Sequence, residues 1–421
     1  MSAPDPGAAR ATAWVTHLRS GGTTPWAAWT GTTDGPAPRV LPGAQQLELL
    51  RRLNEVGPVP GDLTERVLAA SAAGRGRPDL ELVGSRPPSE FGPPPVDPAD
   101  LPAEELLRVA ALLLAEDLAA ADTGPGGDPG ADDLRRLAAD AARRVRRRAA
   151  WRRPWRTRYR LVGDPWRADV LRRDLVARGR PPGGRGALVL VVADDLATIL
   201  ADLWTDRCFS TGVAVPAWGT WLDSLAGARR VARGADPAAV AARWARGVGR
   251  DRVRIVLDDR ALAELLGVDA LAARPVLPAH AVELARLVSG ALGLLVTPEP
   301  GRRLMREVLL PRLLEQAART GGPPLGGPPE HHRWVHRRSL RLRDAVRAGD
   351  YPVLGQVEDL VSRPRVLAAR APAPAAVADD RVLALAADLL LGRTGPDGTA
   401  QGQAAAQGQA GPGRARREEQ A

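Results

Sequence analysis

The turn Gly163-Asp164-Pro165-Trp166-Arg167 stands where a phosphate-binding chain would carry its binding loop. It follows a stretch typical of a strand and opens a stretch typical of a helix, so backbone amides and the helix dipole favour an anion there. The usual phosphate loop has further glycines, a lysine and a hydroxyl, whereas this turn has none of them and Asp164 is itself an anion. A phosphate at this turn would have to be held by arginine and backbone amides.

Two adjacent carboxylates, Asp194 and Asp195, directly follow the apolar run of residues 187–193. Carboxylates can act as general bases or metal ligands, but adjacent residues leaving a strand usually point to different sides. Either residue can also cap the helix that follows. We favour helix capping and keep the catalytic or metal-binding role as the alternative.

Histidines in the C-terminal third of the chain form a second candidate functional site. His332 and His336 are four residues apart, a spacing that puts two imidazoles on one helical face as metal ligands. Neighbouring arginines surround them with positive charge, which disfavours a cation. We therefore expect a solvent-facing basic helix here and no metal.

A dense arginine run lies before the turn and is interleaved with Trp151, Trp155 and Tyr159. Its members are Arg143, Arg144, Arg146, Arg147, Arg148, Arg152 and Arg153. The favoured interpretation is a solvated face of a helix over residues 131–150 that leads into the first strand. The alternative is a nucleic-acid or polyanion contact, because arginines pair with phosphates and aromatic rings stack on bases.

Composition limits the chemistry that the chain can perform. All 59 basic residues are arginine, because the 421-residue chain contains no lysine. A phosphate-binding lysine, a Schiff-base lysine and a lysine general base are thereby excluded. Cys208 is the single cysteine, so an internal disulfide and a cysteine zinc site are excluded as well. The net charge of +10 favours an anionic ligand or partner.

Periodic patterns predict the elements that position the turn and the acids. Residues 158–162 alternate basic and apolar side chains, residues 166–178 repeat apolar residues at helical spacing, and residues 187–193 are continuously apolar. A strand that is apolar on both sides belongs in a parallel sheet covered on both faces. Further strands are expected within 251–258 and 351–360. The sequence thus predicts an α/β fold, with a short parallel sheet flanked by helices and ligands at the carboxyl ends of its strands.

Linkers rich in proline and glycine divide the chain into four expected segments. These are a partly disordered N-terminal segment, 1–40; an α-helical region, 41–150; an α/β domain, 151–392; and a disordered tail, 393–421. The N-terminus lacks the apolar core of a signal peptide, and the most apolar helix is interrupted by charges. We therefore expect a cytoplasmic protein without a transmembrane segment.

The order of elements from about Tyr159 to Leu360, roughly half of the chain, resembles the bacterial P-loop sulfotransferase-like family. RLVGDPWRADVLRRDL is similar to that family's strand, Gly-x-Pro-Lys-Ser/Thr-Gly-Thr-Thr loop and helix. VVADDLATILADLW resembles its strand with an Arg-Asp-Leu end, and PAWGTWLDSL and VAARWARGVGRDRVRIVLDD resemble the tryptophan-bearing segments that follow. AGDYPVLGQVEDLV is similar to its closing segment.

The resemblance implies a sulfotransferase-like fold with 3′-phosphoadenosine-5′-phosphosulfate (PAPS) as donor. It implies a donor site at Gly163, Asp164, Trp166, Arg167 and Asp194, where the family has a lysine and hydroxyls in the loop and an arginine at the strand end. Because these positions are substituted, we expect a noncatalytic or divergent protein that requires no cofactor. The resemblance links it to surface glycan or lipid modification, with a protein partner or an anionic ligand.

Two alternatives stay open. The chain could be an active sulfotransferase in which Arg167, Arg172 or Arg185 holds the donor phosphates of PAPS. It could instead be an arginine-rich protein that binds nucleic acid or another polyanion.

Overall fold

Four parallel strands form one sheet in this computed structural model, which describes residues 6–33, 41–70, 79–85, 94–122, 157–210, 214–363 and 379–393. The strands are β1 Tyr159–Gly163, β2 Leu188–Val192, β3 Val253–Val256 and β4 Val353–Leu354, and they pair in that order. All three pairings are parallel, so the carboxyl ends of the strands share one edge of the sheet. The predicted α/β fold is confirmed, with helices flanking the sheet and an α-helical N-terminal region.

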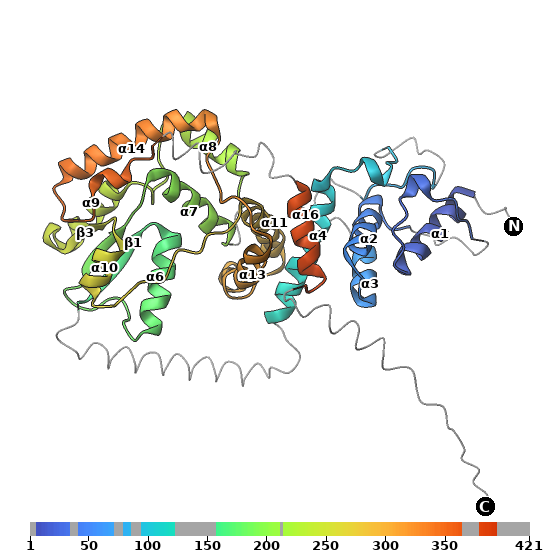
Figure 1. Cartoon of the computed structure of the whole chain (residues 1–421), viewed down its shortest axis with the longest axis horizontal. Helices are drawn as coiled ribbons and strands as arrows, with labels where there is room; N and C mark the ends of the chain where they lie inside the picture. Colours follow the sequence, from blue (N-terminus) through green and yellow to red (C-terminus); the bar gives the residue numbers. More distant parts are fainter. Residues whose placement is uncertain are drawn as a thin grey trace, which may run out of the picture.

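Helices cover both faces of the sheet, as the continuously apolar strand predicts. Val189 and Val191 of β2 point into one core, which α7 (Leu196–Cys208), α9 (Pro237–Val248) and α14 (Pro329–Gly349) help to form. Leu190 and Val192 point into a second core with α6 (Pro165–Ala177) and α10 (Asp259–Leu266). Figure 1 shows these helices around the strands at one end of the molecule.

Aspartates begin three of the helices that follow strands. Asp164 caps α6 after β1, Asp195 caps α7 after β2 and Asp258 caps α10 after β3, each accepting from a backbone amide of the first turn. Helix capping therefore gathers carboxylates at the edge where the strands end. The predicted capping role is confirmed for Asp195.

The remaining α-helices precede the sheet in the chain, lie between its strands or follow it. They are α1 Pro6–Arg19, α2 Ala44–Val56, α3 Gly61–Ala69, α4 Ala103–Asp122, α8 Trp218–Gly227, α11 Ala279–Leu295, α12 Pro298–Leu304, α13 Leu310–Thr320 and α16 Asp379–Leu390. A π-helical segment, Met305–Leu309, separates α12 from α13. In Figure 1, α4 lies against α11 and α16, between the sheet and helices α1 to α3, and these contacts are close.

Some expectations fall on residues that the structure does not describe. The arginines of the run at 143–153 and the tail after Arg393 lie outside the described residues. Within the described ranges, no helix is long and apolar enough to cross a membrane. Helix α14 begins at Pro329, so it includes the histidines that the sequence placed on a solvent-facing helix.

Candidate functional site

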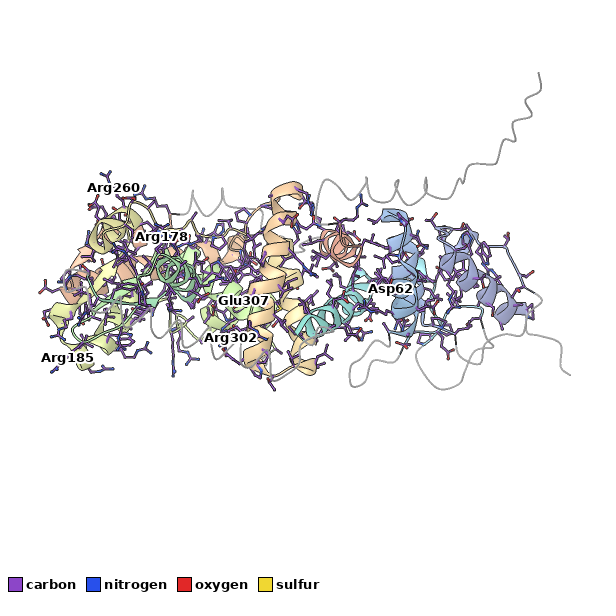
Figure 2. All side chains as sticks on the ribbon, turned by 90° about the horizontal axis from the view of Figure 1, so that it is seen from below. Asp62, Arg178, Arg185, Arg260, Arg302 and Glu307 are labelled. Carbon is purple, nitrogen blue, oxygen red and sulfur yellow. The ribbon has the colours of Figure 1, made fainter. Side chains whose placement is uncertain are left out.

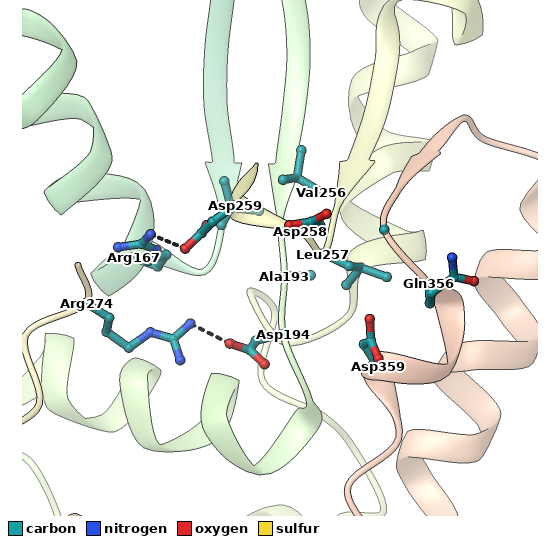
Figure 3. A pocket seen from close by; sticks show the side chains of 12 residues that line it. Arg167, Ala193, Asp194, Val256, Leu257, Asp258, Asp259, Arg274, Gln356 and Asp359 are labelled. Atoms are coloured by element: carbon teal, nitrogen blue, oxygen red, sulfur yellow. Dashed lines mark hydrogen bonds and ion pairs between the residues drawn. The ribbon is translucent and has the colours of Figure 1, made fainter. Parts of the chain in front are cut away.

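A cavity of about 420 Å³ opens at the carboxyl edge of the sheet, where the topology predicts a ligand. The charged side chains that line it are Arg167, Asp194, Asp258, Asp259, Arg274 and Asp359. Figure 3 shows Arg167 directed at Asp259 and Arg274 directed at Asp194, with Asp359 on the far wall. Four carboxylates therefore face two guanidinium groups, which is the opposite of the charge balance that a phosphate site needs.

Gly163 ends β1 in a conformation that only glycine adopts readily. Its φ is +103°, and a Cβ atom there would lie 2.3 Å from the carbonyl oxygen of Val192. The glycine thus serves close packing of the turn against β2. It leaves no open cradle for a phosphate.

Asp164 is fully buried at the first turn of α6. Its Oδ1 accepts a hydrogen bond from the backbone amide of Arg167 at 3.2 Å. Burial raises the pKa of Asp164. The side chain therefore occupies an amide that an anion would use, and it brings a carboxyl group to the same place.

Trp166 and Arg167, the last two residues of the turn, are both buried and contact different partners. Trp166 is 1% exposed, donates its indole N–H to the carbonyl oxygen of Pro275 and packs on Phe209. Arg167 is 3% exposed, pairs with Asp259 and donates to the carbonyl oxygen of Ala272 at 2.6 Å. Both side chains thus fasten α6 to neighbouring segments, and the charge of Arg167 is already compensated.

Arg274 holds three carboxyl groups together. Its Nη2 lies 2.8 Å from Oδ2 of Asp194 and 3.9 Å from Oδ2 of Asp164, and its Nε lies 3.0 Å from Oδ2 of Asp202. The Asp202 contact is ionic, because neither atom makes a well-directed hydrogen bond. Burial, followed by the nearby Asp164 charge, raises the pKa of Asp202 well above its usual range.

The structure brings together only part of the predicted donor site. Arg167 and Asp194 line the cavity. Asp164 contacts Arg274, which also binds Asp194, and Trp166 borders a second cavity. Gly163 is enclosed in the turn.

The other arginines proposed as phosphate ligands lie elsewhere. Arg172 pairs with Asp169 on α6. Arg185 lies in the turn before β2, at the amino edge of the sheet, and Figure 2 shows it at the periphery of the molecule.

Sequence reasoning missed Arg274 and Asp202. Arg274 lies in a loop without periodicity, so the sequence carries no signal for it. Asp202 did carry one, because it interrupts an apolar helix in ATILADLW at a position that does not cap any helix end.

The histidines of α14 contact separate partners and do not converge. His331 is buried and its Nε2 lies 3.1 Å from Oδ1 of Asp223. Nε2 of His332 lies 2.8 Å from the carbonyl oxygen of Gly327, and Nδ1 of His336 lies 2.9 Å from that of Ser362. In the part of the chain that the structure describes, no group of three or more metal-ligating side chains could hold an ion. The expectation that the histidine-bearing helix faces solvent is wrong where it passes α8, because His331, the residue before His332, is buried there.

The residues at the turn do not fit PAPS. Gly163 has no open cradle, the Arg167 amide is taken by Asp164, and the Arg167 guanidinium is taken by Asp259.

A scan of protein-family models and searches of curated proteins and of solved structures found no match to this chain.

Proposed function

We propose that the protein is a noncatalytic, sulfotransferase-like protein that acts in surface glycan or lipid modification without binding PAPS. The observation that carries the proposal is the buried side chain of Asp164, which caps α6 in the place of a donor phosphate. The setting in glycan or lipid modification rests on the sequence resemblance. A protein partner or an anionic ligand other than the nucleotide would bind elsewhere on the chain.

Electrostatics at the turn supports exclusion of the donor. Two like charges about 4 Å apart repel by about 4 kcal/mol at an effective dielectric constant of about 20. Protonation of Asp164 would remove its charge but would leave its side chain bound to the Arg167 amide. A phosphate would therefore have to displace the cap as well as overcome the charge.

Calorimetric titration with 3′,5′-adenosine bisphosphate tests the proposal. We expect no heat of binding for the wild-type protein up to millimolar nucleotide. Asp164→Gly, which frees the amide and removes the carboxylate, is the matched variant in which weak binding would identify Asp164 as the excluding group. Micromolar binding by the wild-type protein would contradict the proposal.

The second candidate is an active sulfotransferase that uses arginine for the donor phosphates. It is favoured by Arg167 and Arg274, which both line the cavity at the strand ends. Each would first have to leave its carboxylate partner, Asp259 or Asp194. Nucleotide binding that is lost in Arg167→Ala would support this candidate.

The third candidate, a nucleic-acid or polyanion contact through the arginine run at 143–153, stays a prediction. It expects affinity for a polyanion that falls steeply with salt and is lost when the run is neutralised.

A further inference from the structure

A second cavity, of about 210 Å³, lies between α6, α7 and the loops that precede α11 and α14. We call it the Trp166 cavity. Trp166, Leu277 and Leu325 contribute apolar walls. The polar side is formed by Thr198, Asp202 and Thr205 of α7 and by Arg274, which is already paired with carboxylates. Val276, which is 62% exposed, lies at its border and keeps apolar surface in contact with solvent. An apolar chamber with a few polar groups on one side is typical of a small-molecule site.

Asp202 is the unusual member of this lining. It is 8% exposed, it lies in the middle of α7 and it caps no helix. Its Oδ2 makes the ionic contact with Nε of Arg274, and its carboxyl group also pairs with that of Asp164. Ionisation of a carboxyl group that is buried beside another carboxyl group is costly, so a cation from solvent would stabilise its ionised form.

The local charge balance indicates the sign of that ligand. Arg274 is one guanidinium shared by three carboxyl groups, those of Asp164, Asp194 and Asp202. Arg306, whose guanidinium lies over the Trp166 ring, is already bound to two carboxylates of its own, Asp169 and Asp206. Positive charge is therefore deficient at the polar side of the Trp166 cavity.

We propose that the Trp166 cavity binds a small organic cation, a primary ammonium group on an apolar body. The ammonium group binds at the carboxylate of Asp202, and the apolar body packs against Trp166 and Leu277. At about 30 Å³ for each water-sized group, the cavity accepts about seven heavy atoms. The proposal does not depend on whether the chain binds a nucleotide.

Proton release provides a readout specific to this site. Burial is the main cause that raises the pKa of both Asp164 and Asp202, with Asp194 adding to the effect and Arg274 opposing it. The nearby Asp164 raises the pKa of Asp202 further, whereas the hydrogen bond with Asp202 lowers the pKa of Asp164. The carboxyl pair consequently retains a proton to higher pH than isolated aspartates do. A cation that binds at Asp202 favours the ionised pair, so binding should release protons at any pH where the free protein still holds a proton on the pair.

Three probes that share the same apolar ring but differ in the charge of their polar group separate the contributions of charge and shape to binding. Cyclohexylamine, cyclohexanol and cyclohexanecarboxylate are titrated into the full-length protein by calorimetry, in two buffers of different ionisation enthalpy. We expect the amine to bind at least tenfold more tightly than the alcohol, with proton release, and the carboxylate not to bind. In Asp202→Asn the amine should bind no more tightly than the alcohol, whereas Asp223→Asn, an exposed carboxylate on α8, should behave as wild type.

A second variant tests whether the probes bind inside the Trp166 cavity, and it leaves Asp202 unchanged. Ala201 lines the same cavity, and Ala201→Leu should fill it and abolish binding of both the amine and the alcohol. Circular dichroism and thermal melting establish that each variant is folded. The proposal is overturned if the carboxylate binds best, if amine and alcohol bind equally to the wild type, if the amine does not bind, or if Ala201→Leu leaves its affinity unchanged.

Discussion

Replacement of Arg274 by methionine tests the charge cluster that connects the two cavities. Methionine keeps an unbranched chain of similar length but leaves Asp164, Asp194 and Asp202 without their shared cation. Removal of one partner from a buried ion pair costs about 3–5 kcal/mol. The Arg274 side chain is 22% exposed, so we expect the lower end, a loss of about 3 kcal/mol in the free energy of unfolding near pH 7.

Urea unfolding followed by tryptophan fluorescence measures this loss, since the chain contains 11 tryptophans. The loss should shrink as the pH falls towards about 4, because protonated carboxyl groups no longer repel each other or need a cation. Arg260→Met is the matched control, since Arg260 lies exposed on α10 in Figure 2 and should change stability by no more than about 0.5 kcal/mol. A loss below about 1 kcal/mol for Arg274→Met, or one independent of pH, would refute the reasoning.

Two further changes probe the same edge of the sheet. Gly163→Ala should destabilise by about 2–4 kcal/mol, because a side chain at φ +103° is strained and its Cβ would meet the Val192 carbonyl oxygen at 2.3 Å. Gly186→Ala, also at positive φ but in open space, should lose less in the same urea experiment, and equal losses would contradict the packing argument. The Asp202→Asn variant should become more stable relative to the wild type as the pH rises above about 4. Because the pKa of Asp202 is raised in the native state, its ionisation lowers the stability of the wild-type protein, and asparagine does not ionise. Urea titrations of both proteins at several pH values measure this gain, and a constant difference would count against a raised pKa.

Local patterns were sufficient to predict the sheet, and they say less about which helices meet. Residues 187–193 read as a doubly covered strand because both alternating sets of side chains are apolar, and β2 has a core on each face. The apolar face of α4 predicts that another element packs on it, but not which element does so. That α11 and α16 provide the cover depends on contacts between distant parts of the chain, for which a single sequence has no periodic signal.

The same distinction applies to the site. Its place at the strand ends follows from the strand-turn-helix pattern at Gly163 and from Asp194 after β2. Arg274 could not be predicted, because its role is set by where the loop after α10 runs. The pairing of Asp164 with Asp202 depends on the way α6 packs against α7, and a turn and a helix read separately do not reveal it.

The contact of α4 with α16 has a consequence for how the protein is made. These two helices are neighbours in space, but all of the α/β segment is synthesised between them. At about 5–20 residues per second, a ribosome needs roughly 10–50 s to cover that distance. During that interval Leu106, Leu113 and the other buried side chains of α4 lack their final cover, so the nascent chain presents an apolar helix to chaperones until α16 emerges.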